Sequence, residues 1–139
     1  MVDSDGGGCW REEKREALMV KDVKELEVFK SAHNLVLRIY KITENFPQDE
    51  RFGLVSQMRR SAFSIPMNLI EGSNRLNTRE YRRFVGIAKG SAGEISYQIL
   101  LARDLRYITE EMYSNLKNEY EIVIKMLSNL AKSLERKIQ

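Results

Sequence analysis

The sequence predicts an all-α protein, an antiparallel up-down-up-down four-helix bundle. Apolar residues recur at spacings of three and four along most of the chain, which is the period of an amphipathic helix. Only two prolines occur among 139 residues, whereas a protein built from strands spends many prolines at turns. Apolar residues make up 42% and charged residues 31%, a balance typical of a globular chain rather than a disordered one.

Residues 1–20 are expected to form a flexible tail, and residues 21–139 the four-helix bundle domain. The tail contains Gly6, Gly7 and Gly8, which favour a flexible backbone. Its acidic residues outnumber its basic ones, whereas the rest of the chain is basic. The acidic start MVDSDGGG does not have the pattern of a secretory signal.

The first helix is expected to begin near residue 25 and to end before Pro47, where its apolar pattern stops. The second is expected to begin near Asp49, an acceptable N-cap, and to end at residues 72–74. Pro66 lies inside this second helix. Because proline removes one backbone hydrogen bond, we expect a bend one turn earlier, near residues 62–63.

The third helix opens with Asn77 as its N-cap and Glu80 three residues later, and it is expected to run unbroken to Tyr107. The fourth is expected to start at Thr109. Acidic residues lie in its first turn and basic residues near its end, where the helix dipole favours each sign. Those basic residues are Lys132, Arg136 and Lys137.

Three glycines, Gly86, Gly90 and Gly93, lie inside the third expected helix. Each costs about 1 kcal/mol relative to alanine there. Two explanations compete: a turn that splits the segment into two helices, or small residues that let another helix approach closely. We favour the second, because the apolar stripe from Phe84 to Leu105 keeps its phase across the glycines.

The sequence contains too few histidine and cysteine side chains for most catalytic sites. One histidine, His33, and one cysteine, Cys9, cannot provide the ligands of a zinc site. A single cysteine permits no internal disulfide, which is consistent with a cytoplasmic protein. No apolar run reaches the roughly 18 residues of a membrane span. We therefore expect no membrane, metal or cofactor and no enzymatic activity, and we interpret His33 as a hydrogen-bonded structural residue.

Paired carboxylates are a further catalytic possibility that the spacing opposes. Glu71 and Glu94 lie on the second and third expected helices, which face each other. The rise per residue places them roughly 20 Å apart along the axis. Glycosidase carboxylates lie much closer together than this. The pair is therefore not interpreted as catalytic.

A basic band is the strongest candidate for a binding surface. Seven basic residues lie between positions 59 and 89, against two acidic ones. Arginine forks match phosphate oxygens, so the band is suited to nucleic acid, although a solvated helix face with intrahelical ion pairs is the alternative. No aromatic stacking platform is evident beside it. The residues expected to contact nucleic acid are Arg59, Arg75, Arg79, Arg82, Arg83 and Lys89.

Facing positions on the second and third helices are expected to pair polar groups that fix their register. Glu71 is expected to meet Arg79 or Arg83, and Arg60 to meet Glu94. The same two helices carry more apolar residues than one bundle face requires. This surplus indicates a second interface and a homo-oligomer, unless the core is wider than expected.

Two segments, residues 52–73 (beginning FGLVSQMRRSA) and residues 83–94, resemble the hallmark of a known family. It comprises the four-helix-bundle proteins encoded in intervening sequences of bacterial 23S ribosomal RNA genes, and includes the accessory variability determinant of diversity-generating retroelements. The resemblance covers residues 24–137, with Ile70 where the family more often has alanine. It assigns structural roles to Arg60, Ser64, Pro66, Asn68, Glu71, Gly72, Gly90, Ser91 and Glu94.

The resemblance implies an up-down bundle that assembles as a ring-like homopentamer. For the retroelement branch it also implies a basic surface that contacts nucleic acid and a reverse transcriptase. The expected function is therefore that of a non-enzymatic homo-oligomer that binds the backbone of RNA or DNA. The alternative is a protein-interaction scaffold that recruits a partner enzyme such as a reverse transcriptase, without direct contact to nucleic acid.

Overall fold

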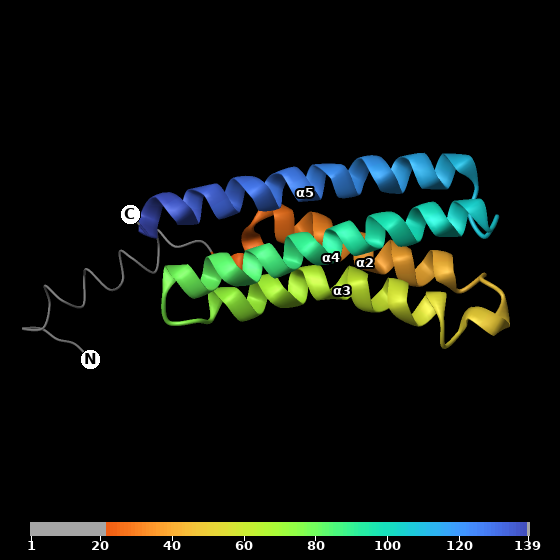
Figure 1. The fold of residues 1–139 in the computed structure, drawn as a ribbon, viewed down its shortest axis with the longest axis horizontal. Coiled ribbons are helices and arrows are strands. Elements are labelled where there is room, and N and C mark those ends of the chain that lie inside the picture. Colours follow the sequence, from red (N-terminus) through yellow and green to blue (C-terminus); the bar gives the residue numbers. More distant parts are fainter. Residues whose placement is uncertain (1–21, 139) are drawn as a thin grey trace, which may run out of the picture.

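The computed structural model describes residues 22–138, and these form helices and no strand (Figure 1). The prediction of an all-α protein with four long helices is confirmed. The predicted tail, residues 1–20, lies outside the described residues. In chain order the elements are the short 3₁₀ helix η1 (Val23–Glu25), α2 (Glu27–Thr43), the 3₁₀ helix η2 (Gln48–Glu50), α3 (Leu54–Ser73), α4 (Thr78–Asp104) and α5 (Glu110–Ile138).

The four long helices lie side by side along the long axis of the molecule (Figure 1). α4 packs against α3 and α5, and α2 packs against the same two helices. The α3–α4 turn and the end of α5 lie at one end of the molecule, whereas the α2–α3 and α4–α5 connections lie at the other (Figure 1). Each end therefore brings together residues that are far apart in the sequence.

A continuous apolar core runs between the helices, and all four contribute to it. Burial of these side chains supplies the main driving force for folding. None of the helices within residues 22–138 has an apolar stretch that is long enough to cross a membrane. The largest fully buried side chains are Leu35, Ile39, Met58, Ile65, Leu69, Ile95, Ile99, Leu116, Tyr120 and Leu127.

Some of the predicted helix ends are confirmed and others are wrong. The Asn77 side chain accepts a hydrogen bond of 2.8 Å from the backbone N–H of Glu80, which confirms the predicted cap of α4. α4 stops at Asp104, before the predicted Tyr107, and Arg106 adopts a left-handed conformation with φ of 67°. α3 begins at Leu54 rather than near Asp49, because η2 precedes it as a separate turn.

The Glu50 carboxylate holds this separate turn in place. One of its oxygens accepts a hydrogen bond of 3.2 Å from the backbone N–H of Leu54. The other accepts one of 2.9 Å from the Tyr107 hydroxyl. The turn after α2 is thereby tied both to the start of α3 and to the connection between α4 and α5. This long-range tie has no counterpart in the local sequence pattern.

α4 continues unbroken through Gly86, Gly90 and Gly93, as expected, but no other helix of the chain approaches these three glycines. A Cβ atom added at any of the three would have nothing within 4 Å. The small residues that pack inside the bundle are instead Ala88, Ser91 and Ala92. The three glycines therefore form a stripe on the outer face of α4, at spacings of four and three residues.

The hydroxyl of Tyr120 is buried in the core without a hydrogen-bond partner among the described residues. Burial raises the pKa of this phenol well above its ordinary value, because the phenolate would lose its hydration. The unfolded chain therefore releases this proton near pH 10, while the folded chain retains it.

Folding stability is expected to fall above pH 10, with Tyr120 contributing up to about 1.4 kcal/mol per pH unit. Tyr120→Phe removes this contribution and leaves no unpartnered hydroxyl. Urea unfolding followed by circular dichroism between pH 8 and pH 11 measures the effect. The variant should lose less stability with rising pH than the parent protein, and identical pH profiles would contradict the expectation.

Candidate nucleic-acid interface

The six residues that the sequence proposed for nucleic-acid contact do not form one surface. Arg59 lies on α3 and faces α2, where its guanidinium stacks 4.5 Å from the ring centre of Tyr40. The other five lie around the α3–α4 turn and the first half of α4. Fourteen residues of α3 separate Arg59 from Ser73, where the helix ends, which corresponds to about 21 Å, and Arg75 lies beyond this end. The structure therefore divides the predicted band into two regions.

Around the α3–α4 turn, some of the arginines are committed to contacts inside the chain. Arg75 forms an ion pair of 2.9 Å with Glu71, and Arg82 one of 2.7 Å with Glu135 of α5. The guanidinium groups of Arg75 and Arg83 lie 4.7 and 5.1 Å from the ring centre of Phe84. These contacts orient the side chains, but the arginines themselves are exposed, so the ion pairs carry little stabilisation.

Arg79 and Lys89 are exposed and form no ion pair within the described residues. Together with Arg83 they keep their charges available for a ligand. The Arg82–Glu135 pair also shows that the end of α5 lies beside the start of α4. Basic residues of α5 are thereby brought to the same end of the molecule.

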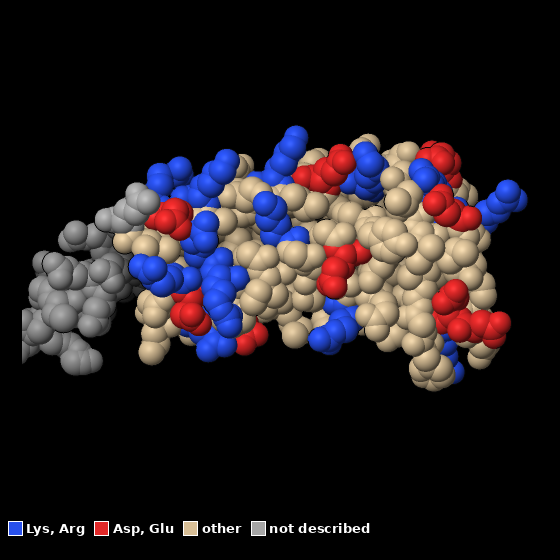
Figure 2. Space-filling model, viewed as in Figure 1, with Lys and Arg blue, Asp and Glu red and all other residues tan. Residues whose placement is uncertain are grey.

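These α5 residues extend the surface beyond the sequence prediction. Lys and Arg side chains gather at the end of the molecule where the α3–α4 turn and the end of α5 lie (Figure 2). In the sequence these cations were interpreted only as partners of the helix dipole. We call this group of residues the basic end: Arg75, Arg79, Arg82, Arg83, Lys132, Arg136 and Lys137, with Lys89 farther along α4, near its middle.

Three of the nine family-motif residues form a hydrogen-bond network between α3 and α4. The hydroxyl groups of Ser64 and Ser91 lie 2.8 Å apart. The Asn68 amide donates to the Ser64 hydroxyl at 2.9 Å and to the Ser64 carbonyl oxygen at 2.7 Å. Ser91 is buried, so this network satisfies a polar group inside the helix pair. These residues therefore have a structural role in the packing of α3 on α4.

Gly72 marks a close approach of α3 to α4. A Cβ atom added there would lie 2.7 Å from Cβ of Phe84 and 3.0 Å from Cδ1 of Tyr81. Only glycine fits at this point without a shift of one helix. Pro66, buried on the same helix, lies within α3, which continues through it without a break.

The other motif residues lie outside the helix pair. Arg60, Glu94 and Gly90 are exposed, and no ion pair joins Arg60 to Glu94 within the described part of the chain. Glu71 pairs with Arg75 in the turn that follows α3, rather than with Arg79 or Arg83 as expected. The expected register pairs are therefore replaced by the Ser64–Ser91 contact, which lies nearer the middle of the two helices.

The interpretation of His33 as a hydrogen-bonded residue is wrong for the described part of the chain, where its side chain makes no hydrogen bond. His33 is exposed on α2 and stacks on Phe29, with ring centres 6.3 Å apart and planes inclined by 11°. Within residues 22–138, no group of three or more His, Cys, Asp and Glu side chains is arranged to hold a metal ion.

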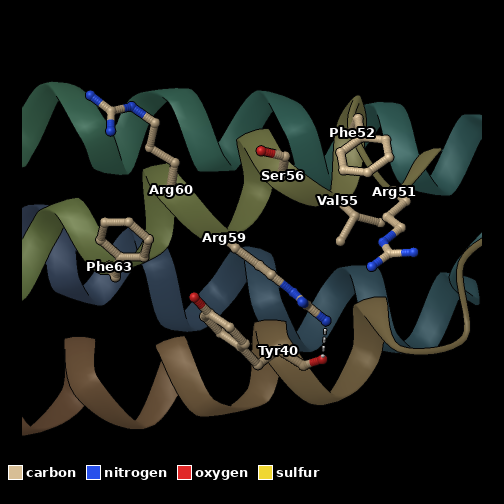
Figure 3. A pocket seen from close by; sticks show the side chains of 8 residues that line it. All are labelled: Tyr40, Arg51, Phe52, Val55, Ser56, Arg59, Arg60 and Phe63. Atoms are coloured by element: carbon tan, nitrogen blue, oxygen red, sulfur yellow. Dashed lines mark hydrogen bonds between the residues drawn. The ribbon is translucent and has the colours of Figure 1, made fainter.

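An open groove surrounds Arg59 at the other region of the divided band. It measures about 440 Å³ and lies between α2 and α3 (Figure 3). The expectation that no aromatic platform accompanies the arginines is wrong here. Phe63 lies one turn after Arg59 on α3, a neighbour that helical spacing shows. Tyr40 is contributed by α2 and Phe52 precedes α3, so spacing does not show that these two rings approach Arg59. The groove is lined by Tyr40, Arg51, Phe52, Val55, Ser56, Arg59, Arg60 and Phe63.

Comparison with known proteins supports the resemblance drawn from the motifs. A family model described as 23S rRNA-intervening sequence protein matches residues 24–129. A crystal structure of a protein of unknown function, from the S23 ribosomal protein family of Bacteroides thetaiotaomicron VPI-5482, has a similar fold, with a TM-score of 0.68 and 27% identity. The match covers 76% of this chain and 98% of that one. No protein with a curated description matches this chain.

Gly72→Ala is expected to lower the free energy of unfolding by about 1–3 kcal/mol, the usual cost of inserting a methyl group into a well-packed contact. Urea denaturation measures the change. Ser114→Ala, on the exposed side of α5, is the control and should change stability by less than about 0.5 kcal/mol. Equal stability of the Gly72→Ala variant and the parent would show that α3 and α4 do not need this close approach.

Proposed function

The chain belongs to the 23S rRNA-intervening sequence protein family, and on this premise we propose that it is a non-enzymatic, homo-oligomeric antiparallel up-down-up-down bundle that binds the backbone of RNA or DNA. The observation that carries the proposal is the basic end. Cations from the α3–α4 turn, from α4 and from α5 converge there, although the sequence separates them by more than forty residues.

The chemistry of the basic end suits phosphate groups. Arg79, Arg83 and Lys89 are exposed, and the arginine forks match pairs of phosphate oxygens. Each cation that neutralises a phosphate releases a condensed counterion, which favours binding at low salt. Such contacts fix the position of a backbone without reading its sequence. The proposed ligand is therefore a structured nucleic acid held by its backbone, in the cytoplasm.

The outer face of α4 supports assembly into a ring-like homo-oligomer, with a pentamer as the form that the family resemblance implies. Gly86, Gly90 and Gly93 lie in open space along one stripe of this face. Tyr97, four residues after Gly93, continues the stripe and is 61% exposed. Small residues on a helix let another helix approach closely. In a ring, several basic ends act together, so weak contacts add up through effective concentration.

A protein-interaction scaffold is the second candidate, because one apolar side chain lies among the cations. Leu76, in the α3–α4 turn, is fully exposed. An exposed leucine beside arginines suits the centre of a protein interface, where apolar groups are covered and charges form the rim. A partner enzyme such as a reverse transcriptase would be recruited through this turn.

Arg79→Gln combined with Arg83→Gln is expected to weaken binding to an RNA duplex and to reduce the slope of log affinity against log salt by about 2, since two phosphate contacts are lost. Fluorescence anisotropy with a labelled duplex across a series of salt concentrations measures both quantities.

The matched control removes two cations at the opposite end of the molecule, Arg106→Gln combined with Lys117→Gln, and should leave the salt slope unchanged. Loss of binding in both double variants would show a general charge effect. If the parent protein does not bind at low salt, backbone binding is excluded and the scaffold becomes the better candidate.

Gly90→Leu is expected to break the proposed oligomer, because a large side chain on the outer face of α4 keeps a second helix at a distance. Light scattering should give a multiple of 16.2 kDa for the parent protein and a lower mass for the variant, with equal helical circular dichroism. Asn118→Leu, at an exposed position of α5, is the control and should keep the parent mass. A parent mass of 16.2 kDa would contradict the proposed assembly.

A further inference from the structure

The groove between α2 and α3 combines arginine side chains with aromatic rings. Arg51, Arg59 and Arg60 line it together with Tyr40, Phe52 and Phe63 (Figure 3). No aspartate or glutamate belongs to this lining. Its volume of about 440 Å³ falls within the range of small-ligand sites in proteins. The groove therefore offers positive charge and flat apolar surface in one place.

Arg59 is held in position before any ligand arrives. Its Nε donates to the Thr43 hydroxyl at 2.9 Å, and its Nη2 donates to the Tyr40 carbonyl oxygen at 3.2 Å. Its guanidinium plane also lies over the Tyr40 ring. Among the described residues, no acceptor takes a hydrogen bond from Nη1 and no carboxylate pairs with this arginine. A fixed cation with a spare donor is suited to an anionic oxygen.

Phe52 is the most unusual side chain of the groove. It is 86% exposed, although a phenylalanine gains stability mainly by burial. The Arg51 guanidinium lies 5.3 Å from its ring centre, so a cation accompanies this ring as well. Tyr40 is also exposed, and Phe63 is half-buried. Nothing in the packing of the single chain accounts for an exposed ring at the start of α3.

A second hollow of about 210 Å³ adjoins the groove and shares Arg51, Val55 and Arg59 with it. It reaches Glu44, just after α2, and Gln48 of η2, so one carboxylate joins the two arginines in its lining. Arg51 and Arg59 thus lie between two adjoining hollows. Arg60, in contrast, extends away from the Tyr40 ring and marks the outer side of the groove (Figure 3). This arrangement suits a chain-like anion that passes over Arg59, rather than a single ion.

We propose that this groove binds an unpaired nucleotide of a single-stranded segment, with its phosphate on Arg59 and Arg51 and its base stacked on Phe52. The inference rests on the proposed binding of nucleic acid and names a separate region for it. Every base has a flat π face, so aromatic rings beside cations bind single strands with little sequence preference. An acidic peptide would satisfy the arginines but would leave the ring of Phe52 without a stacking partner.

The test compares two substitutions at Phe52. Phe52→Leu keeps an apolar side chain but removes the ring, and Phe52→Tyr keeps the ring. The probe is a labelled, 5′-phosphorylated hexauridylate, and its binding is measured by fluorescence anisotropy at low salt. We expect Phe52→Leu to bind roughly 5- to 150-fold more weakly, which is the effect of losing one stacked base. Phe52→Tyr should bind as the parent protein does.

Folding of these variants is not at risk, because Phe52 is almost fully exposed. Ile122→Ala, which truncates an exposed apolar side chain of α5, is the control and should bind the probe normally. Hexadeoxyuridylate, which differs from the probe only in its sugar, distinguishes the two: binding that also depends on Phe52 extends the groove to DNA, and absence of binding restricts it to RNA. Both results support a nucleotide site.

Equal affinity of the Phe52→Leu variant and the parent protein for hexauridylate would overturn the inference. So would competition by hexaglutamate at the same concentration as unlabelled hexauridylate, since this would show a site for any polyanion. The proposed function fails in a different way. A parent protein that binds hexauridylate through Phe52 but does not bind a duplex would support the nucleotide site in the groove and would contradict nucleic-acid binding by the basic end.

Discussion

The close packing of α3 on α4 is the constraint on which the rest of the structure depends. Gly72 lets the two helices approach until Phe84 and Tyr81 fill the space of a side chain. The Ser64–Ser91 hydrogen bond then fixes their register where both helices are buried. With α4 set in this way, α5 follows its other side and brings its last turns beside the α3–α4 turn. The basic end is thus a product of helix packing rather than of one segment.

Much of the fold could be predicted from the sequence because helical periodicity is a local signal. The cap at Asn77 and the continuous stripe of α4 depend on neighbouring residues, and both hold in the structure. The predicted start of α3 near Asp49 was wrong, because residues 48–50 form a separate turn. The Glu50 carboxylate of this turn accepts a hydrogen bond from the Tyr107 hydroxyl, 57 residues away in the sequence. Sequence spacing carries no information on such a contact. The glycines of α4 predict the close approach of another helix, but no helix of the same chain lies against them, because they are on the outer face of α4.

The candidate site was predicted less well, for a related reason. Charge counted along the chain grouped Arg59 with Arg79 and Arg83, although the length of α3 separates them. The same count omitted Lys132 and Arg136, because only the packing of α5 beside α4 brings these two residues to the end of the molecule where Arg79 and Arg83 lie. The aromatic side chains beside Arg59 were missed because Tyr40 lies on α2, nineteen residues earlier. A position on a helix is readable from sequence, but the neighbour across a groove is not.

The distance between Arg59 and Arg75 has a consequence for the architecture of any RNA that contacts both regions. The part of α3 from Arg59 to its end spans about 21 Å, which corresponds to roughly seven or eight base pairs of an A-form RNA stem at a rise of about 2.8 Å per pair. An RNA with a stem of this length and a frayed terminus or bulge beyond it would match the spacing. A shorter or longer stem would place its unpaired residue short of Arg59 or past it. α3 would then act as a molecular ruler that discriminates hairpins by their size, without reading a single base-pair edge.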